Sequence, residues 1–203
     1  MSLPSRLLVV TDRHGAATPL TERVAAALAG GAQWIWLRDR DLPETERAAL
    51  AEEVAGLVGR AGGRLGIGRD VELAARLGAD GVHLGGAAAI PAARARLGGG
   101  AVIGVSAHSL AEVAAAREAG ADYATLSPIF ATRSKPGYGP ALGLDALHAA
   151  AATGLPVLAL GGIDPAAAAA CRAAGASGVA VMGGVMAAPD PAAAVRALLA
   201  AAA

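Results

Sequence analysis

The sequence is poor in aromatic residues and cysteine, and it carries no net charge. Only 2% of its 203 residues are aromatic although 55% are apolar, so small and branched aliphatic side chains must fill the core. Cys171 is the one cysteine, which excludes an internal disulfide and a cysteine-ligated zinc cluster and favours a reducing compartment. A formal net charge of zero argues against general binding to nucleic acid or to anionic membranes.

Long apolar runs are also missing. The run Leu7–Val10 is too short for a signal peptide and is followed at once by charged residues. No stretch reaches the roughly 18 uninterrupted apolar residues that a membrane-spanning helix needs. We therefore expect a soluble, cytoplasmic protein with a single domain over residues 1–203, a length that suffices to bury a large core.

Short β-branched runs alternate with longer segments rich in alanine, leucine, arginine and glutamate, which is typical of βα units and a parallel sheet. The predicted strands are Leu7–Val10, Trp34–Leu37, Leu65–Ile67, Gly81–Leu84, Val102–Val105, Tyr123–Leu126, Val157–Leu160 and Val179–Val181. The predicted helices span 19–29, 43–61, 70–77, 89–97, 109–119, 142–153, 165–174 and 190–202. Eight units in about 200 residues predict an α/β fold of the (β/α)8 TIM barrel type, with short loops.

A Gly-Ala pair recurs before each even-numbered strand. The pairs are Gly31-Ala32, Gly78-Ala79, Gly120-Ala121 and Gly175-Ala176. We expect each glycine to end a helix in the left-handed conformation and each alanine to let the loop pack closely. An open Rossmann-type sheet would usually lack this fourfold recurrence, so the pattern favours the barrel while leaving the open sheet as an alternative.

Two glycine turns form the sharpest candidate site, because the active site of such a barrel lies at the C-terminal ends of its strands. Gly161, Gly162 and Ile163 follow the seventh strand, and Gly183 and Gly184 follow the eighth. Turns without side chains leave backbone N–H groups open to an anion, and helix N-termini favour negative charge. These residues therefore predict a phosphate site; the alternative is that they only form tight turns.

Positive side chains follow the second and sixth strands. Arg38 and Arg40 come directly after the second strand, and Lys135, the one lysine among 17 basic residues, lies in the loop after the sixth. Guanidinium forks suit phosphate or carboxylate oxygens, and a lysine acts as a mobile point charge. We predict that all three bind the substrate, with Arg69 and Arg133 as further candidates for this positive group. The alternative for Arg38 and Arg40 is structural ion pairing with Asp39, Asp41 or Asp12.

Hydroxyl groups supply two further predicted substrate contacts. Ser106 follows the fifth strand, and Thr132 begins the long loop after the sixth. The segment 132–140 is rich in hydroxyl residues, glycine and proline, a composition that suits a mobile lid more than a plain connector.

Two histidines are candidates for proton transfer. His108 lies just past the fifth strand, and His83 lies at the end of the fourth. For each of them the alternative is a neutral, hydrogen-bonded structural role. The sequence shows neither the spacing of a Ser/His/Asp triad nor a nucleophile elbow.

Several of these segments together resemble the thiamine phosphate synthase superfamily, in order and over nearly the whole chain. They include GADGVHLG at 78–85, IGVSAHS at 103–109, SPIFAT at 127–132, LGGI at 160–163 and GVAVM at 178–182. The resemblance implies one of two activities on a barrel that binds a thiazole phosphate at the glycine turns. The synthase joins a pyrimidine diphosphate to the thiazole phosphate with Mg²⁺ and releases pyrophosphate. The thiazole tautomerase, called TenI, moves a proton on a carboxythiazole phosphate.

Departures from the synthase pattern affect the pyrimidine contact and the metal ligands. Where the synthase has Gln-x-Arg-x-Lys, residues 36–40 read Trp-Leu-Arg-Asp-Arg. Its Asn-Asp-Arg is replaced by Gly-Arg-Asp at 68–70, and His-Leu-Gly-Gln-x-Asp by His-Leu-Gly-Gly-Ala-Ala at 83–88. Mg²⁺ needs hard oxygen ligands, so the loss of both carboxylates argues against a metal, although Asp70 is displaced by only one residue.

These departures lead us to expect a metal-independent thiazole tautomerase without cofactor, acting on a small phosphorylated thiazole. The tautomerase pattern has a histidine after the sixth strand where this chain has Pro128, which leaves His108 as the first candidate for proton transfer. The alternatives are a Mg²⁺-dependent synthase and a thiazole-phosphate-binding protein without activity. Family members often pair, so a homodimer is expected, with no nucleic acid or membrane partner.

Overall fold

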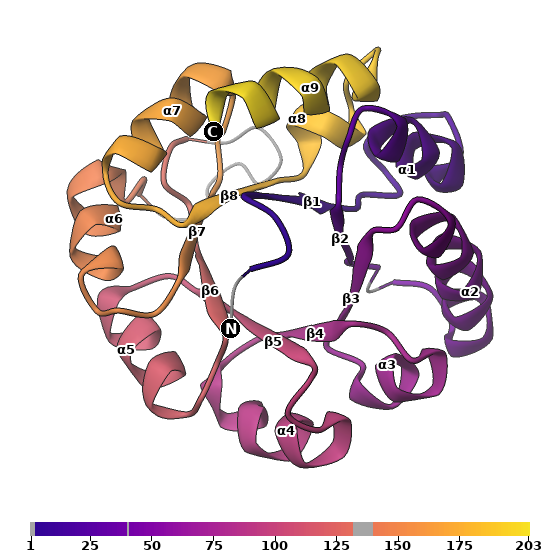
Figure 1. The fold of residues 1–203 in the computed structure, drawn as a ribbon, viewed down its shortest axis with the longest axis horizontal. Coiled ribbons are helices and arrows are strands. Elements are labelled where there is room, and N and C mark those ends of the chain that lie inside the picture. Colours follow the sequence, from indigo (N-terminus) through magenta and orange to yellow (C-terminus); the bar gives the residue numbers. More distant parts are fainter. Residues whose placement is uncertain (1–2, 40, 132–139) are drawn as a thin grey trace.

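A closed barrel of parallel strands forms the centre of the molecule. The computed structural model describes residues 3–39, 41–131 and 140–203. Each strand pairs with the next along the chain, and β8 closes the ring on β1 (Figure 1). The strands are β1 (Leu7–Val10), β2 (Trp34–Leu37), β3 (Arg64–Gly68), β4 (Gly81–Leu84), β5 (Val102–Ala107), β6 (Tyr123–Leu126), β7 (Val157–Leu160) and β8 (Gly178–Val181). The predicted (β/α)8 barrel is confirmed, and the open sheet is excluded.

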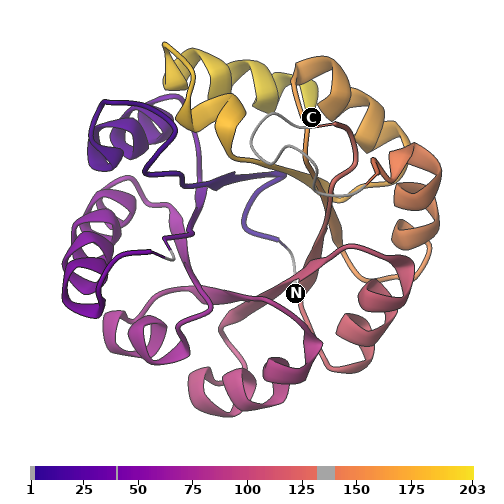
Figure 2. The ribbon, with the colours of Figure 1, turned by 180° about the vertical axis from the view of Figure 1, so that it is seen from behind.

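Helices surround the barrel on its outer side, as both end-on views show (Figures 1 and 2). They are α1 (Leu20–Ala29), α2 (Glu44–Arg60), α3 (Val71–Leu77), α4 (Ile90–Leu97), α5 (Leu110–Glu118), α6 (Gly143–Ala151), α7 (Pro165–Ala173) and α9 (Pro191–Ala201). Two short elements were not predicted, the 3₁₀ helix η1 (Ala87–Ala89) and helix α8 (Gly183–Met186). α8 immediately follows β8, where barrels of this type often place a short extra helix beside a phosphate.

Large side chains fill the inside of the barrel. Residues that alternate along the strands form this inner cluster, which includes Leu8, Val10, Trp34, Trp36 and Tyr123. Trp34 and Tyr123 meet edge to face, with ring centroids 4.8 Å apart. Three of the chain's few aromatic residues thus pack in one place, while aliphatic residues fill the layer between the strands and the helices.

The recurring Gly-Ala pairs behave as predicted. Gly31, Gly78, Gly120 and Gly175 all have positive φ, at 100°, 59°, 85° and 96°. An aspartate follows two of the pairs and ties the neighbouring strand to the turn. Asp80 accepts hydrogen bonds from the Leu65 N–H at 2.8 Å and from Arg64 at 2.6 Å, and Asp122 accepts from the Ile103 N–H and from Arg94, both at 2.7 Å.

Replacing Asp122 with alanine is expected to lower the free energy of unfolding by about 2 kcal/mol, because it leaves the Ile103 N–H without its acceptor and removes the ion pair with Arg94. The Asp122 side chain is 18% exposed, so water replaces the lost contacts only in part. Urea denaturation measures the change. Glu118→Ala removes an exposed carboxylate nearby and serves as the control; equal stability of the two variants would contradict the assigned role of Asp122.

The single cysteine is part of the core. Cys171 is fully buried on α7, and burial raises the pKa of its thiol to about 11. Among the described residues, we find no helix that is long and apolar enough to cross a membrane.

Candidate active site

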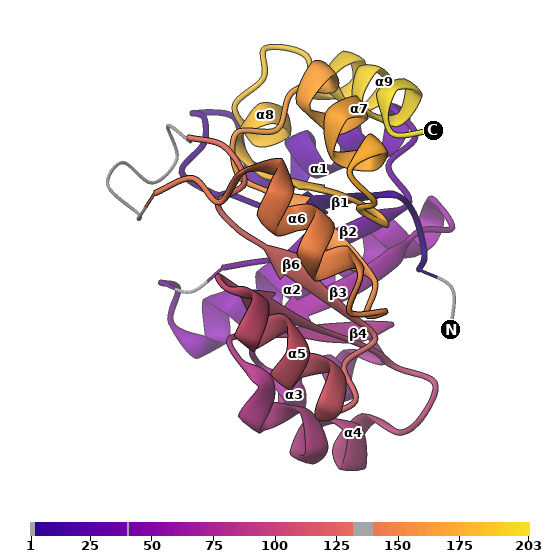
Figure 3. The same cartoon turned by 90° about the vertical axis from the view of Figure 1, so that its left-hand side faces the viewer.

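A cavity of about 660 Å³ opens at the C-terminal ends of the strands, where the barrel rule places active sites. Its walls come from residues at or after the ends of several strands: Arg38 after β2, Arg69 after β3, Ser106 and His108 at β5, Ser127 and Pro128 after β6, and the glycine turns after β7 and β8. The side view places α8 at the left-hand end of the barrel and the C-terminus at the right-hand end (Figure 3). The cavity volume is within the usual range of small-molecule sites.

Both predicted phosphate turns line this cavity, so the structure brings Gly161, Gly162, Ile163, Gly183 and Gly184 together. Gly161 and Gly162 have φ of 99° and 67°, a conformation that favours glycine. A Cβ on Gly162 would lie only 2.5 Å from the Ala131 carbonyl oxygen, so no side chain fits there. Gly183 and Gly184 form the first turn of α8, and first-turn N–H groups have no acceptor within their own helix. The two turns therefore present backbone donors to one wall of the cavity.

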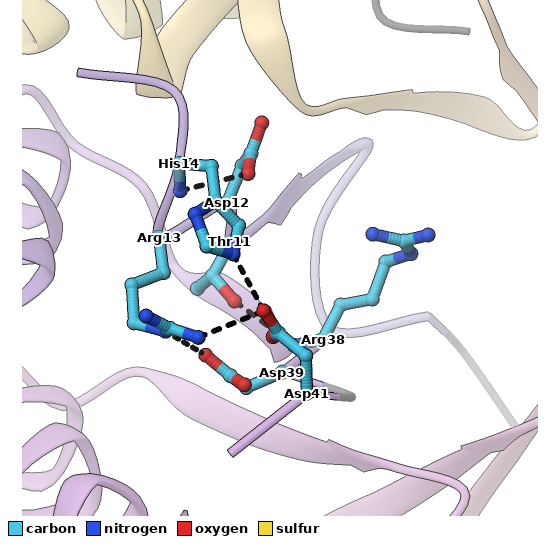
Figure 4. Close-up of polar contacts among 7 residues, drawn as sticks. All are labelled: Thr11, Asp12, Arg13, His14, Arg38, Asp39 and Asp41. Atoms are coloured by element: carbon cyan, nitrogen blue, oxygen red, sulfur yellow. Dashed lines mark hydrogen bonds and ion pairs between the residues drawn. The ribbon is translucent and has the colours of Figure 1, made fainter.

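Arg38 reaches the cavity because other residues neutralise the carboxylates around it. Arg13 binds Asp39 at 3.0 Å and Asp41 at 2.9 Å, and His14 binds Asp41 at 2.7 Å. Figure 4 shows the Arg38 side chain extending away from this cluster. Its guanidinium contacts the Met182 sulfur at 3.8 Å, at the end of β8. Among the described residues, Arg38 forms no ion pair with Asp12, Asp39 or Asp41, the partners of the alternative interpretation.

The same cluster holds the entrance loops of the first two strands in place. The Thr11 hydroxyl oxygen accepts a hydrogen bond from the Arg38 backbone N–H at 2.9 Å (Figure 4). Thr11 directly follows β1, so the end of β1 fixes the position of the Arg38 backbone. The hydrogen bond from His14 and the contacts with Arg13 lower the pKa of Asp41 to about 2. The Asp41 carboxylate therefore stays ionised, Arg13 occupies both Asp39 and Asp41, and Arg38 remains available to an anion.

His108 lies on the cavity wall with its ring held in one orientation. Ser109 caps α5 by accepting from the Glu112 N–H at 3.2 Å, and Glu112 accepts from the His108 N–H at 2.6 Å. The ring Nδ1 lies 2.7 Å from the carbonyl oxygen of Ser127. A carbonyl can only accept, so Nδ1 carries the proton in the neutral ring, and Nε2 is the nitrogen that can take up a proton.

His83, the second candidate for proton transfer, lies in the barrel interior. Its side chain is 1% exposed and stacks on Trp36, with ring centroids 3.7 Å apart. Nδ1 lies 2.9 Å from the Tyr123 hydroxyl, and Nε2 lies 3.1 Å from the Ser106 hydroxyl. Burial raises the pKa of Tyr123, so this phenol keeps its proton. His83 is not part of the cavity wall, and the cavity contains Ser106, the hydroxyl at the end of this chain of hydrogen bonds.

Three predicted substrate contacts cannot be placed. Arg40, Thr132 and Lys135 lie outside the described residues, as does most of the loop 132–140 that we expect to act as a lid. Ser106, the remaining predicted contact, is half-buried on the cavity wall.

The described residues do not fit a magnesium ion of the family type. Asp70, the displaced carboxylate, accepts from the Leu73 N–H at 2.9 Å with one oxygen and from Arg47 at 2.6 Å with the other. After β4 stand Gly85 and Gly86, where a Cβ on Gly85 would lie 2.8 Å from the Arg69 guanidinium. Among the residues that the structure describes, no group of three His, Cys, Asp or Glu side chains could hold a metal. The carboxylates expected from the synthase pattern are thus absent or engaged elsewhere, and a positive charge lies where they would gather.

Two further residues line the cavity. Arg69, which the sequence left open as a further member of the positive group, is one of them, and Trp36, noted from the sequence only as the replacement of a glutamine, is the other. The Trp36 indole N–H is buried and has no acceptor among the described residues. The signal for Arg69 was the Gly85-Gly86 pair after the fourth strand, which leaves room for a long side chain from the neighbouring strand.

Comparisons with known proteins identify the family. Residues 7–185 match the family model described as thiamine monophosphate synthase. The chain belongs to this family. It is 46% identical over 198 residues to a putative thiamine-phosphate synthase of Geobacter sulfurreducens, an alignment that covers 96% of this chain and 92% of the relative. It is 45% identical over 194 residues to a thiamine-phosphate synthase of a Roseiflexus species, with 94% and 82% covered.

A solved structure agrees with this assignment. The thiamine phosphate pyrophosphorylase from Pyrococcus furiosus superposes with a TM-score of 0.84 at 30% identity, covering 97% of this chain and 94% of that one. The family and the link to thiamine biosynthesis that we expected are therefore confirmed. The names of the relatives favour the synthase alternative over the tautomerase that we placed first, and the tautomerase branch gains no support from them.

Proposed function

We propose that this protein is a thiamine-phosphate synthase, which joins a pyrimidine diphosphate to a thiazole phosphate. The observation that carries the proposal is the placement of anion-binding groups on two sides of one cavity. The glycine turns follow β7 and β8, and Arg69 follows β3, which lies opposite β7 in a ring of eight strands. Two separated anion sites suit two phosphorylated substrates whose reacting atoms meet between them. The synthase names of relatives at 40–46% identity support the same reaction.

In this reaction the thiazole nitrogen attacks the methylene carbon of the pyrimidine diphosphate. A carbon–nitrogen bond forms, the carbon–oxygen bond to the diphosphate breaks, and pyrophosphate leaves with the electron pair. The glycine turns would hold the thiazole phosphate and so fix the position of the nucleophile. Arg38, which reaches from β2 toward β8, would neutralise phosphate charge between the two sites. Hydrogen-bond donors already in place stabilise the charge that develops on the leaving group.

The experiment that tests the proposal supplies both substrates to the purified protein and oxidises the product to a fluorescent derivative. We expect thiamine phosphate to form at a rate proportional to protein concentration, both with Mg²⁺ and with EDTA. If the protein is folded and binds thiazole phosphate but forms no thiamine phosphate, the synthase assignment is contradicted.

Thiazole tautomerisation is a second candidate, and the geometry of His108 favours it. The ring lies on the cavity wall with Nδ1 fixed by the Ser127 carbonyl, so Nε2 could exchange a proton with a bound thiazole. This reaction needs no diphosphate and no metal, in keeping with the missing carboxylates.

Replacing His108 with alanine separates the two candidates. If the protein is a tautomerase, we expect proton exchange on a carboxythiazole phosphate to fall on the order of 10²- to 10⁴-fold, because a positioned base is lost. Binding of the thiazole phosphate should change little, since the glycine turns hold the phosphate. The control His148→Ala alters an exposed residue on α6 outside the cavity. Unchanged proton exchange in His108→Ala would exclude His108 as the base.

A further inference from the structure

Arg69 has an unusual backbone conformation that directs its side chain across the end of β4. Among the described residues other than glycine, it alone has positive φ, at 63°. Its N–H donates to the His83 carbonyl at 2.8 Å, which holds this conformation in place. A Cβ built on Gly85 would lie 2.8 to 3.1 Å from three atoms of the Arg69 guanidinium. The guanidinium therefore lies against Gly85, in space that exists because residue 85 has no side chain.

No carboxylate among the described residues neutralises Arg69. Asp70, its neighbour in the chain, uses one oxygen to cap α3 and the other to bind Arg47. Arg38 follows the adjacent strand, β2, and it also forms no ion pair among the described residues. Arg13 forms the ion pairs with Asp39 and Asp41 instead (Figure 4). Two guanidinium groups thus line one cavity with no acidic partner within the described part of the chain.

Trp36 is a third residue on this side of the cavity. The Trp36 indole nitrogen is buried, lacks an acceptor among the described residues, and would lie 3.0 Å from a Cβ placed on Gly68 at the end of β3. The same Cβ would lie 3.5 Å from the Arg38 Cα, so Arg38, Trp36 and the end of β3 are neighbours. Guanidinium groups can only donate hydrogen bonds, so the part of the wall formed by Arg38 and Arg69 favours an acceptor with several oxygens.

We propose that the Arg69 guanidinium, together with Arg38, forms a binding site for the diphosphate of the pyrimidine substrate that needs no metal ion. The proposal rests on the proposed synthase function and extends it. A guanidinium presents two parallel N–H donors to phosphate oxygens and stays charged at any pH at which the protein is folded. It neutralises the leaving pyrophosphate at the place where the described residues offer no carboxylates for a cation.

The test measures binding of inorganic pyrophosphate by isothermal titration calorimetry in the presence of EDTA. We expect the unaltered protein to bind, and Arg69→Asn to bind about 10- to 100-fold more weakly, as for a lost charge-assisted contact. Asparagine tolerates positive φ, so the variant keeps the local backbone. The control Arg76→Gln removes the same charge from the exposed face of α3 and should bind like the unaltered protein. Affinity for the thiazole phosphate should stay within about twofold in both variants, since the glycine turns are untouched.

Two results would overturn this proposal, namely binding of pyrophosphate only after Mg²⁺ is added, or equal binding by Arg69→Asn and the unaltered protein. Failure of the synthase function gives a different pattern. If pyrophosphate binds through Arg69 in EDTA but no thiamine phosphate forms, the anion site stands and the synthase assignment falls. If thiamine phosphate forms only with Mg²⁺, the synthase assignment stands and the metal-free site is wrong.

Discussion

Replacing Gly162 with alanine is expected to weaken binding of the thiazole phosphate by about 100-fold, which corresponds to roughly 2.7 kcal/mol. The added methyl would lie 2.5 Å from the Ala131 carbonyl oxygen and 2.8 Å from Phe130 Cβ, so the turn after β7 must move. The backbone at Gly162 has φ of 67°, which costs an alanine roughly 1–2 kcal/mol in addition. Both effects displace the donors that we assign to the phosphate. Titration calorimetry with thiazole phosphate measures the loss.

The control for this variant is Gly120→Ala. Gly120 has φ of 85° but nothing within 4 Å of an added Cβ, and it lies before β6, at the other end of the strands. This change imposes a similar backbone strain on the fold without touching the cavity. If both variants lost the same affinity, the effect would come from general destabilisation, and the phosphate assignment for the β7 turn would fail.

Replacing Gly104 with alanine is expected to lower the free energy of unfolding by about 3 kcal/mol, at the upper end of the usual cost of overpacking. Gly104 is buried on β5, and an added Cβ would lie 2.0 Å from Tyr123 Cζ and 2.4 Å from its hydroxyl oxygen. The phenol ring would have to leave its place against Trp34, and its hydrogen bond to His83 would be disturbed. Thermal and urea denaturation measure the loss of stability.

Gly99→Ala is the matched control for Gly104→Ala, because residue 99 is exposed and an added Cβ there meets nothing within 4 Å. We expect that variant to unfold like the unaltered protein. A Gly104→Ala variant as stable as Gly99→Ala would mean that the Tyr123 ring is free to move, and would contradict the packed interior described above.

The sequence was sufficient to predict the barrel because its signals are local. β-Branched runs locate the strands, and Gly-Ala turns mark the start of every even-numbered one. Five of the eight strands have the predicted bounds, and the other three differ by one or two residues at an end. Gly161-Gly162 and Gly183-Gly184 could be placed in the site because the barrel rule assigns a location to whatever follows the last two strands. Helix α8 was missed because its four residues, Gly183–Met186, carry no helical pattern of their own.

The remaining features of the site depend on contacts between strands that are distant from each other in the chain. The stacking of Trp36 on His83 joins β2 to β4, and the hydrogen bond between His83 and Tyr123 joins β4 to β6. No local pattern reveals that these contacts bury His83 beneath the cavity. The side chain of Asp70 could not be assigned either, since its engagement depends on Arg47 from another helix.

The preference for a tautomerase came from reading the lost carboxylates as the loss of the synthase reaction. The relatives with synthase names indicate that this inference went too far. The structure offers a physical alternative, because Arg69 places positive charge where the family pattern leads one to expect metal ligands. Loss of the metal site and loss of the reaction are therefore separate questions for this chain.

The most direct test of the account measures pyrophosphate release and thiamine phosphate formation together, in one reaction with both substrates. We expect equal amounts of the two products, because a single displacement at one cavity generates both. Release of pyrophosphate without thiamine phosphate would show that the diphosphate is hydrolysed. If a folded protein forms neither product, it catalyses a different reaction. Either of these results would contradict the synthase assignment.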